Sequence, residues 1–343
     1  MSMGYSYILS VVLAFVAIAT AAHISINSNS SSAIGFINVT VATLWTNPQK
    51  PRQVDQPALT NPVQIEQWLD SMTLDQFEDL TDSSRLQAQG LYGTRVKILS
   101  HQNGWYEVAV SGEPSPKNSF GYPGWVPECQ IATFDPVFDN RQLTLPFIIA
   151  NKPLVTLYRD SSLNEPLLNI TYGTRLPVLS SGASLQVAVP RSGVPSAFLP
   201  TTSASVYKSV SDIPYPTGED LVNTAQLFYG RPYLWGGSST YGFDCSGLTL
   251  TLYDSHGITI PRDADAQADF VGHGTPVNNS DHLQVGDLLF YASNVSDPST
   301  IYHVAMFAGN GKMIEAFDSG IPVRITPVRF NDDYWGAERF LVH

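Results

Sequence analysis

Cys245 is the residue of this sequence best suited to nucleophilic chemistry. Residues 248–255, which follow it, contain no Gly or Pro, and the His-Gly pair at 256–257 is typical of a helix end. The cysteine is therefore predicted to lie at a helix N-terminus, where free backbone N–H groups and the helix dipole favour an anion. We expect this position to lower the pKa of the thiol. Its N–H groups could also hold an oxyanion when a carbonyl is attacked.

His303 is the best candidate for the base that such a nucleophile needs. It opens an alternating apolar run to Gly309, and the Asn-Gly pair at 310–311 predicts a hairpin turn. If His303 opposes residue 317, Glu315 lies one diagonal away on the same face, where it can accept the imidazole N–H. A two-residue turn changes this parity unless a bulge intervenes, so the register stays an assumption. The alternative for His303 is an ordinary core histidine, and the alternative for Glu315 is a solvated surface acid.

Cys129 is the second of only two cysteines. Two are too few for a disulfide scaffold or a four-ligand zinc site, but they could form one bridge, which would remove the nucleophile. No His-x-x-x-His or Cys-x-x-Cys spacing occurs, so we expect no metal ion and no other cofactor.

Five short motifs follow one another in the last third of the chain. They are Tyr-x-Trp-Gly-Gly from 233, Asp-Cys-Ser-Gly from 244, Pro-Arg-Asp from 261, Val-Gly-Asp-Leu from 285, and His-Val from 303 with Gly-x-Gly from 309. In this order they resemble the NlpC/P60 family of papain-like cysteine peptidases, over roughly the last 130 residues. The resemblance implies an α+β papain-like domain with Cys245 as nucleophile, His303 as base and Glu315 at a third, polar position. That position is more often His in the family.

The same resemblance implies how substrate is held. Tyr233 matches a tyrosine beside the nucleophile, Asp263 matches an acid that binds the substrate's free α-amine, and Ser246 falls next to that acid. Family members cleave the stem peptides of bacterial peptidoglycan, often between D-glutamate and the diamino acid. A carboxylate at 263 suits a free N-terminal L-alanine, because a desolvated ammonium needs a paired charge. The expected partners are therefore muropeptides.

Two other classes of function stay open from the sequence. An amidase or acyltransferase on the same scaffold would use the same Cys, His and acid. A non-catalytic protein could bind the cell wall through the residues that precede the catalytic segment.

Those preceding residues contain a repeat. The run Tyr-Gly-Thr-Arg at 92–95 recurs at 172–175, and short β-rich runs flank both copies. Gly, Asn and Ser turns between such runs predict two small antiparallel barrels. The first copy carries an insertion before residue 92, which includes a helical stretch at 62–80.

The run Gly-Tyr-Pro-Gly-Trp-Val at 121–126, together with Gly-Trp at 104–105, resembles a bacterial SH3-like cell-wall module. Tandem modules of this kind precede the catalytic domain in γ-D-glutamyl-L-diamino acid endopeptidases, where the first module helps to close the pocket. This likeness makes Tyr122 a candidate substrate contact, while Trp125 is assigned to the core.

The predicted fold class is multidomain, with two small all-β SH3-like barrels followed by the α+β papain-like domain. The expected limits are a signal peptide at 1–22, barrels at 23–138 and 139–208, a linker at 209–216 and the catalytic domain at 217–343.

The N-terminus predicts export. Residues 8–22 are almost continuously apolar and end in small residues, as in a cleaved signal peptide, although no Lys or Arg precedes them. The run is shorter than the roughly 20 residues of a spanning helix, and an uncleaved anchor is the alternative. Acceptors for N-glycosylation support a secreted, extracellular glycoprotein. They are Asn29, Asn38, Asn169, Asn278 and Asn294.

The net charge of the chain limits the classes of molecule that it can bind. The 343 residues carry a net charge of −12, which disfavours nucleic acid because phosphates demand positive charge. Most of the imbalance lies in the catalytic segment, where the acids serve solubility or favour cationic groups of a substrate. We expect no stable membrane association and a monomer.

Overall fold

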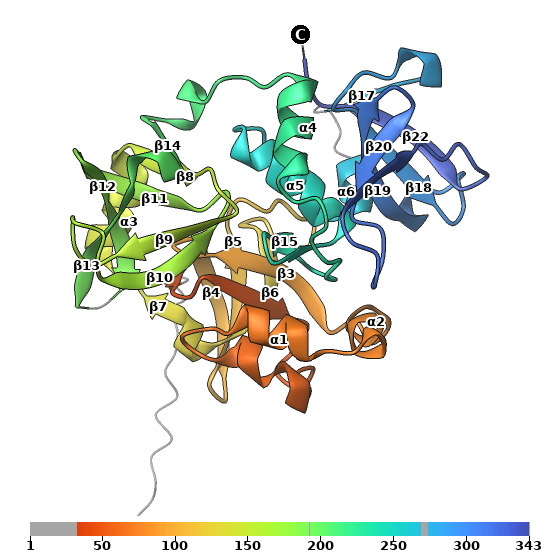
Figure 1. Cartoon of the computed structure of the whole chain (residues 1–343). Coiled ribbons are helices and arrows are strands. Elements are labelled where there is room, and N and C mark those ends of the chain that lie inside the picture. The colour runs from red at the N-terminus through yellow and green to blue at the C-terminus, as the bar shows by residue number, and fades with distance from the viewer. Residues whose placement is uncertain (1–32, 192, 269–273, 343) are drawn as a thin grey trace, which may run out of the picture. The chain divides into compact units, whose positions relative to one another are not determined.

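The computed structural model describes residues 33–191, 193–268 and 274–342 (Figure 1). The predicted signal peptide and Asn29 lie outside these residues. Two seven-stranded sheets, a six-stranded sheet and a two-stranded ribbon account for the strands of the described residues. None of the helices found there has the length and apolar character needed to cross a membrane.

The first sheet has the strand order β3-β2-β6-β5-β4-β1-β7. Its strands are β1 (Ile34–Ile37), β2 (Val41–Trp45), β3 (Leu86–Leu91), β4 (Arg95–Gln102), β5 (Trp105–Val110), β6 (Tyr122–Pro127) and β7 (Ile131–Thr133). Between β2 and β3 lie η1 (Gln53–Leu59), α1 (Ile65–Ser71) and α2 (Leu74–Asp82). The helical insertion predicted at 62–80 is thus confirmed.

The second sheet has the order β10-β9-β13-β12-β11-β8-β14, which is the first order moved on by seven strands. Its strands are β8 (Phe147–Ala150), β9 (Leu154–Tyr158), β10 (Pro166–Thr171), β11 (Arg175–Ser181), β12 (Ser184–Arg191), β13 (Val194–Pro200) and β14 (Ala204–Tyr207). Helix α3 (Pro136–Thr144) connects the two sheets and spans the domain limit predicted at residue 138. The limits themselves and the SH3-like identity stay predictions.

The repeated Tyr-Gly-Thr-Arg run makes the same turn in both sheets. Gly93 and Gly173 both have φ 81°, a left-handed conformation that suits glycine. The Gly93 N–H donates to the Ile37 carbonyl at 2.9 Å, and the Gly173 N–H donates to the Ala150 carbonyl at 3.0 Å. Equal strand order and equal turns support a duplication.

The catalytic segment combines helices with the six-stranded antiparallel sheet β17-β22-β18-β19-β20-β21. Its helices are α4 (Gly218–Gln226), α5 (Cys245–Ser255) and α6 (Ala264–Ala268), and its strands are β15 (Ser238–Ser239), β16 (Gly242–Phe243), β17 (Thr275–Pro276), β18 (Leu288–Ala292), β19 (Ile301–Gly309), β20 (Lys312–Glu315), β21 (Arg324–Pro327) and β22 (Tyr334–Arg339). Helix α5 packs against β19, so the element with the cysteine meets the element with the histidine. This contact positions the site.

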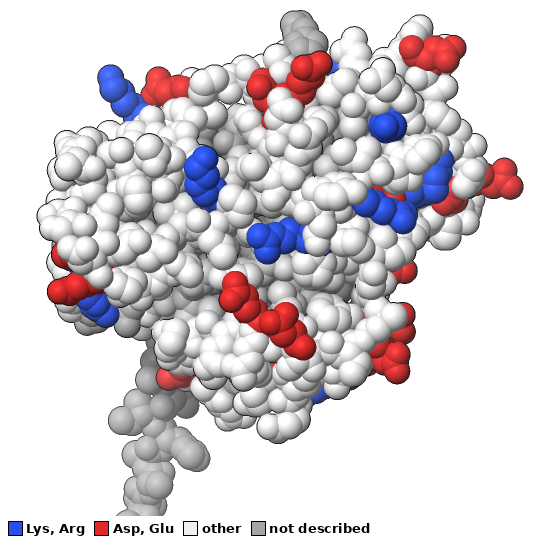
Figure 2. Space-filling view, in the orientation of Figure 1, with Lys and Arg blue, Asp and Glu red and all other residues white. Residues whose placement is uncertain are grey.

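Short 3₁₀ turns complete the described elements. They are η2 (Glu128–Gln130), η3 (Thr201–Ser203), η4 (Val210–Asp212), η5 (Ser280–His282) and η6 (Pro298–Thr300). Figure 2 shows that basic and acidic side chains on the face in view are interspersed among uncharged surface. That face carries no broad basic patch of the kind that binds nucleic acid.

Candidate active site

Cys245 is the first residue of α5, as the sequence predicts. Asp244 caps the helix, and its carboxylate accepts the Gly247 N–H at 2.6 Å and the Gly236 N–H at 2.8 Å. Arg262, only 1% exposed, donates to the same carboxylate at 2.6 and 3.0 Å. The cysteine therefore sits on a helix start that a buried ion pair holds rigidly.

The predicted low thiol pKa is wrong. Burial raises the pKa of Cys245 to about 12, and the Asp244 carboxylate adds to the rise. The backbone N–H groups of Val304 and Ser246 hydrogen-bond to the sulfur and oppose it, without overcoming the loss of water. The helix dipole is a local effect, whereas burial depends on everything packed around the sulfur. At rest the group is a thiol, and its proton must leave during the reaction.

Both cysteines are free thiols, so the bridge alternative does not hold. Cys129 is exposed, whereas Cys245 is buried. The sulfur of Cys245, which accepts the Val304 N–H of β19, is therefore not blocked by a disulfide.

The β19–β20 hairpin places Glu315 on the His303 side of the sheet. Gly309 pairs with Lys312 across the two-residue turn, and a bulge then shifts the register so that Met306 pairs with Ile314. This is the bulge on which the sequence argument depended. His303 Nε2 lies 2.8 Å from Glu315 Oε2, and both side chains are buried. Glu315 is thus no solvated surface acid.

Two arginines hold the far oxygen of the Glu315 carboxylate. Arg324 approaches it at 2.9 and 3.1 Å and Arg329 at 3.0 Å. Burial by itself would raise the pKa of Glu315, but hydrogen bonds from His303 and Arg329 outweigh it and lower that pKa to about 2. The acid is therefore ionised and can only accept.

An ionised Glu315 fixes the tautomer of the imidazole. His303 Nε2 must carry the hydrogen that Glu315 accepts, which leaves Nδ1 unprotonated and able to accept a proton. Burial lowers the pKa of His303, and the positive charges of Arg329 and Arg324 add to this effect. The imidazole is neutral at rest, so thiol and base form a neutral pair.

Tyr122 and Asp263 meet across the boundary between the first sheet and the catalytic segment. The Tyr122 hydroxyl, at the start of β6, lies 2.9 Å from Asp263 Oδ1 and 3.1 Å from Oδ2. Asp263 directly precedes α6 and is 30% exposed at its side chain. The structure thus brings together two residues that the sequence singled out separately.

Tyr233 and Ser246 complete the predicted set. Tyr233 is buried, and burial together with the neighbouring Cys245 raises the pKa of its hydroxyl. The Ser246 hydroxyl is 5% exposed and accepts a hydrogen bond from Arg262 at 3.0 Å. Ser246 therefore supports the Arg262–Asp244 ion pair at the start of α5, and its hydroxyl is engaged there.

Four charged residues escaped the sequence analysis. Arg262 stands inside the Pro-Arg-Asp motif, so its position carried a signal, but its partner Asp244 did not follow from it. Arg324, Arg329 and Lys117 lie in stretches without any motif. The partners of these four residues are seen only in the folded structure.

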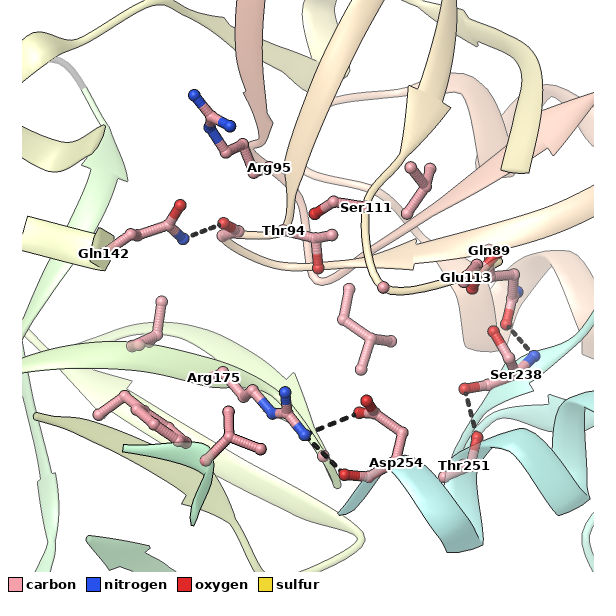
Figure 3. A pocket seen from close by; sticks show the side chains of 18 of the residues that line it. Gln89, Thr94, Arg95, Ser111, Glu113, Gln142, Arg175, Ser238, Thr251 and Asp254 are labelled. Atoms are coloured by element: carbon pink, nitrogen blue, oxygen red, sulfur yellow. Dashed lines mark hydrogen bonds and ion pairs between the residues drawn. The ribbon is translucent and has the colours of Figure 1, made fainter. Parts of the chain in front are cut away.

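A separate cavity of about 360 Å³ lies where the two seven-stranded sheets face α5 (Figure 3). Arg175 and Asp254, which line it, form an ion pair at 3.2 Å, and Glu113 lines it from the connection between β5 and β6. Burial raises the pKa of Glu113 to about 8. Of the described residues that line this cavity, none is a predicted site residue. Nor do the described residues contain a group of three or more His, Cys, Asp or Glu side chains that could hold a metal ion.

Comparison with known proteins agrees with this geometry. The NlpC/P60 family model matches residues 230–342. A γ-D-glutamyl-L-lysine dipeptidyl-peptidase from Bacillus cereus is 41% identical over 326 residues, which cover 94% of either protein. The chain belongs to the NlpC/P60 family. It is a cysteine peptidase of that family, and a second dipeptidyl-peptidase of the same name, from Bacillus subtilis, is 33% identical over 83% of this chain and 90% of its own length.

Solved structures give the same assignment. An NlpC/P60 family protein from Bacillus cereus superposes with a TM-score of 0.84 at 41% identity, covering 90% of this chain and 100% of its own. Among the sequence relatives, a peptidoglycan endopeptidase from Mycobacterium tuberculosis is 38% identical over 113 residues, which are 29% of this chain and 22% of that protein. The catalytic part of the fold is therefore shared with cell-wall hydrolases.

Proposed function

We propose that this protein is a secreted endopeptidase that cleaves peptidoglycan stem peptides between γ-D-glutamate and the diamino acid, on stems with a free N-terminal L-alanine. The observation that carries the catalytic part is the buried His303–Glu315 pair, together with the hydrogen bond from the backbone N–H of the next residue, Val304, to the Cys245 sulfur. A neutral imidazole with a free Nδ1 next to a thiol is the arrangement that nucleophilic attack on an amide requires.

The first half of the reaction forms a thioester. Cys245 Sγ attacks the γ-carbonyl of D-glutamate while the thiol proton moves to His303 Nδ1, and backbone N–H groups at the start of α5 stabilise the oxyanion. Glu315 stabilises the imidazolium that forms. The imidazolium then gives its proton to the amine of the diamino acid, which leaves as the C–N bond breaks.

The second half releases the acyl group. His303 Nδ1 takes a proton from water as the hydroxide adds to the thioester carbonyl, and the C–S bond then breaks. The proton returns to the sulfur through the imidazole, so the thiol and the neutral base are restored. No redox partner is needed.

Asp263 and Tyr122 supply the specificity for the amino end. A carboxylate that accepts a tyrosine hydroxyl at 2.9 Å is suited to an ammonium, whereas a blocked amine carries no positive charge for it to pair with. The names of the two Bacillus relatives, which specify γ-D-glutamyl-L-lysine, support a stem peptide as substrate.

Secretion rests on the apolar residues 8–22 and on the glycosylation acceptors. Among the acceptors in the described residues, Asn169, Asn278 and Asn294 are exposed and Asn38 is half-buried. N-terminal sequencing of the protein from the medium should begin near His23, and a start at Met1 would refute cleavage.

The test of the activity compares the two cysteines. Cys245→Ala should lower the rate of cleavage of L-Ala-γ-D-Glu-L-Lys by at least about 10³-fold, while Cys129→Ala should leave it unchanged. Acetylation of the L-Ala amine should abolish cleavage by the wild type. Mass spectrometry of the products should show L-Ala-D-Glu and free lysine. Undiminished cleavage by Cys245→Ala, or release of whole stems from the sugar, would refute the proposal.

A further inference from the structure

The ammonium of Lys117 already occupies the Tyr122–Asp263 pair. Lys117 Nζ lies 3.0 Å from Asp263 Oδ2, contacts the Tyr122 hydroxyl, and sits 4.3 Å from the centre of the Tyr122 ring. Lys117 belongs to the connection between β5 and β6 in the first sheet, whereas Asp263 belongs to the catalytic segment. The contact therefore crosses the same boundary as the predicted amine subsite.

A carboxylate, a hydroxyl and an aromatic face around one point are what a primary ammonium uses in a binding site. The α-ammonium of L-alanine would need these same three groups. Lys117 Nζ already occupies the point where Asp263 Oδ2, the Tyr122 hydroxyl and the Tyr122 ring face meet, and a second ammonium at that point would meet both its atoms and its positive charge. A ligand amine and Lys117 must exclude each other.

We propose that Lys117 is an internal competitor for the amine subsite and must leave before a stem peptide with a free amine binds. This inference rests on the proposed role of Asp263 in substrate binding. Lys117 keeps the carboxylate neutralised while the site is empty, and the substrate's ammonium takes over that task on binding.

The ion pair is exposed enough to open. The side chain of Lys117 is 44% exposed and that of Asp263 is 30% exposed, unlike the buried pair of Arg262 and Asp244 next to it. Exposed pairs are worth little, so a ligand ammonium can displace the lysine at modest cost.

The backbone of the loop does not have to move with the side chain. The Arg262 N–H donates to the Pro114 carbonyl at 3.0 Å, and the Ser115 hydroxyl accepts the Lys117 N–H at 3.2 Å. A cavity of about 490 Å³, lined by Pro116 and Asp265 among others, adjoins the loop. It offers a displaced ammonium both room and a second carboxylate.

The test measures binding of the dipeptide L-Ala-γ-D-Glu by calorimetry, so it does not depend on cleavage. Lys117→Gln should bind the dipeptide about two- to five-fold more tightly than the wild type, because the competing charge is gone. The KM for L-Ala-γ-D-Glu-L-Lys should fall by the same factor with kcat unchanged. Lys117→Arg, which keeps a cation, should stay close to the wild type.

Lys152→Gln is the matched control for net charge, because this exposed lysine lies in the second sheet unit. Equal affinity in Lys117→Gln and the wild type would overturn the proposal. Weaker binding by Lys117→Gln would also overturn it and would mean that Lys117 contacts an acidic group of the ligand. If neither protein bound the dipeptide, the amine subsite itself would be refuted. If the wild type bound the dipeptide but did not cleave L-Ala-γ-D-Glu-L-Lys, the proposed reaction would be refuted and the amine subsite would stand.

Discussion

The two seven-stranded sheets share their strand order and their Tyr-Gly-Thr-Arg turn, yet among the described residues it is the first sheet unit that supplies the contacts of Asp263 with Tyr122 and Lys117. The difference lies in one connection. In the first sheet residues 111–121 join β5 to β6, whereas in the second the equivalent strand β12 ends at Arg191 and β13 already begins at Val194. The longer connection carries Lys117 and ends at Tyr122.

The second sheet contacts the other end of the catalytic helix. Arg175 donates to the Asp254 carbonyl at 2.6 Å, and the Tyr172 hydroxyl lies 3.3 Å from the Ser255 hydroxyl, both at the end of α5. In the first sheet the equivalent Arg95 pairs instead with Asp139 of α3 at 2.8 Å. The shared turn sets the backbone position of the arginine in both sheets, but the element packed next to it determines its hydrogen-bond partner. One copy thus places Tyr122 against Asp263, and the other supports helix α5, whose first residue is Cys245.

Glu113, which has no counterpart in the short connection of the second sheet, should give the largest effect. Its folded pKa of about 8 lies above its ordinary value of 4.5, so the unfolded chain releases the proton first as the pH rises. The free energy of unfolding should therefore fall between pH 5 and pH 8. Glu113→Gln, which stays neutral, should be roughly 2–4 kcal/mol more stable than the wild type at pH 8 and similar to it at pH 5.

Urea unfolding at the two pH values measures this difference. Glu78→Gln, at an exposed position of α2, is the control and should follow the wild type. If the unfolding free energies of Glu113→Gln and the wild type changed with pH in the same way, burial of Glu113 would not lower the stability of the protein.

The two tyrosines next test which copy handles substrate. Tyr122→Phe removes a hydroxyl that would contact a charged ammonium, so the KM for a free-amine stem peptide should rise about ten-fold with little change in kcat. Tyr172→Phe loses one neutral hydrogen bond to Ser255 and should cost about 1 kcal/mol of stability with KM unchanged. Steady-state kinetics and thermal unfolding separate the two. An equal rise of KM in both variants would contradict the division of roles.

The paired arginines Arg175 and Arg95 test the comparison of the two sheets through stability alone. Arg175→Ala removes a hydrogen bond to the end of α5 and a partner of Asp254, and we expect a loss of about 1–2 kcal/mol in unfolding free energy. Arg95→Ala breaks only the pair with Asp139 and should cost less than about 1 kcal/mol. Chemical denaturation of both variants checks the order, and a larger loss for Arg95→Ala would reverse the comparison.

Much of the catalytic end was predictable because its determinants are local. The helix start at Cys245 follows from Asp244 as a cap and from an uninterrupted run after it. The hairpin follows from Asn-Gly, and the same-face position of Glu315 required only a bulge that the sequence left open. The arginines on Glu315 were not predictable, because no pattern in residues 324–329 states which carboxylate they will meet.

The amine end was predictable only in part. Resemblance to a family pointed to Asp263, and a tyrosine between turn residues pointed to Tyr122, but nothing in the sequence joined them. Lys117 had no signal, since its role depends on where a loop of the first sheet meets the catalytic segment.

The sequence by itself singled out Cys245 at a helix start, His303 on a strand, the duplicated β units and the family, because hydrogen-bond caps, turn residues and strand periodicity act over a few neighbouring positions. Tertiary structure alone decided the protonation of Cys245 and the contact of Lys117 and Tyr122 with Asp263. The physical reason is that desolvation and ion pairing depend on which distant surfaces exclude water together. A local dipole favoured a thiolate, and burial by the packed sheet kept the proton on the sulfur.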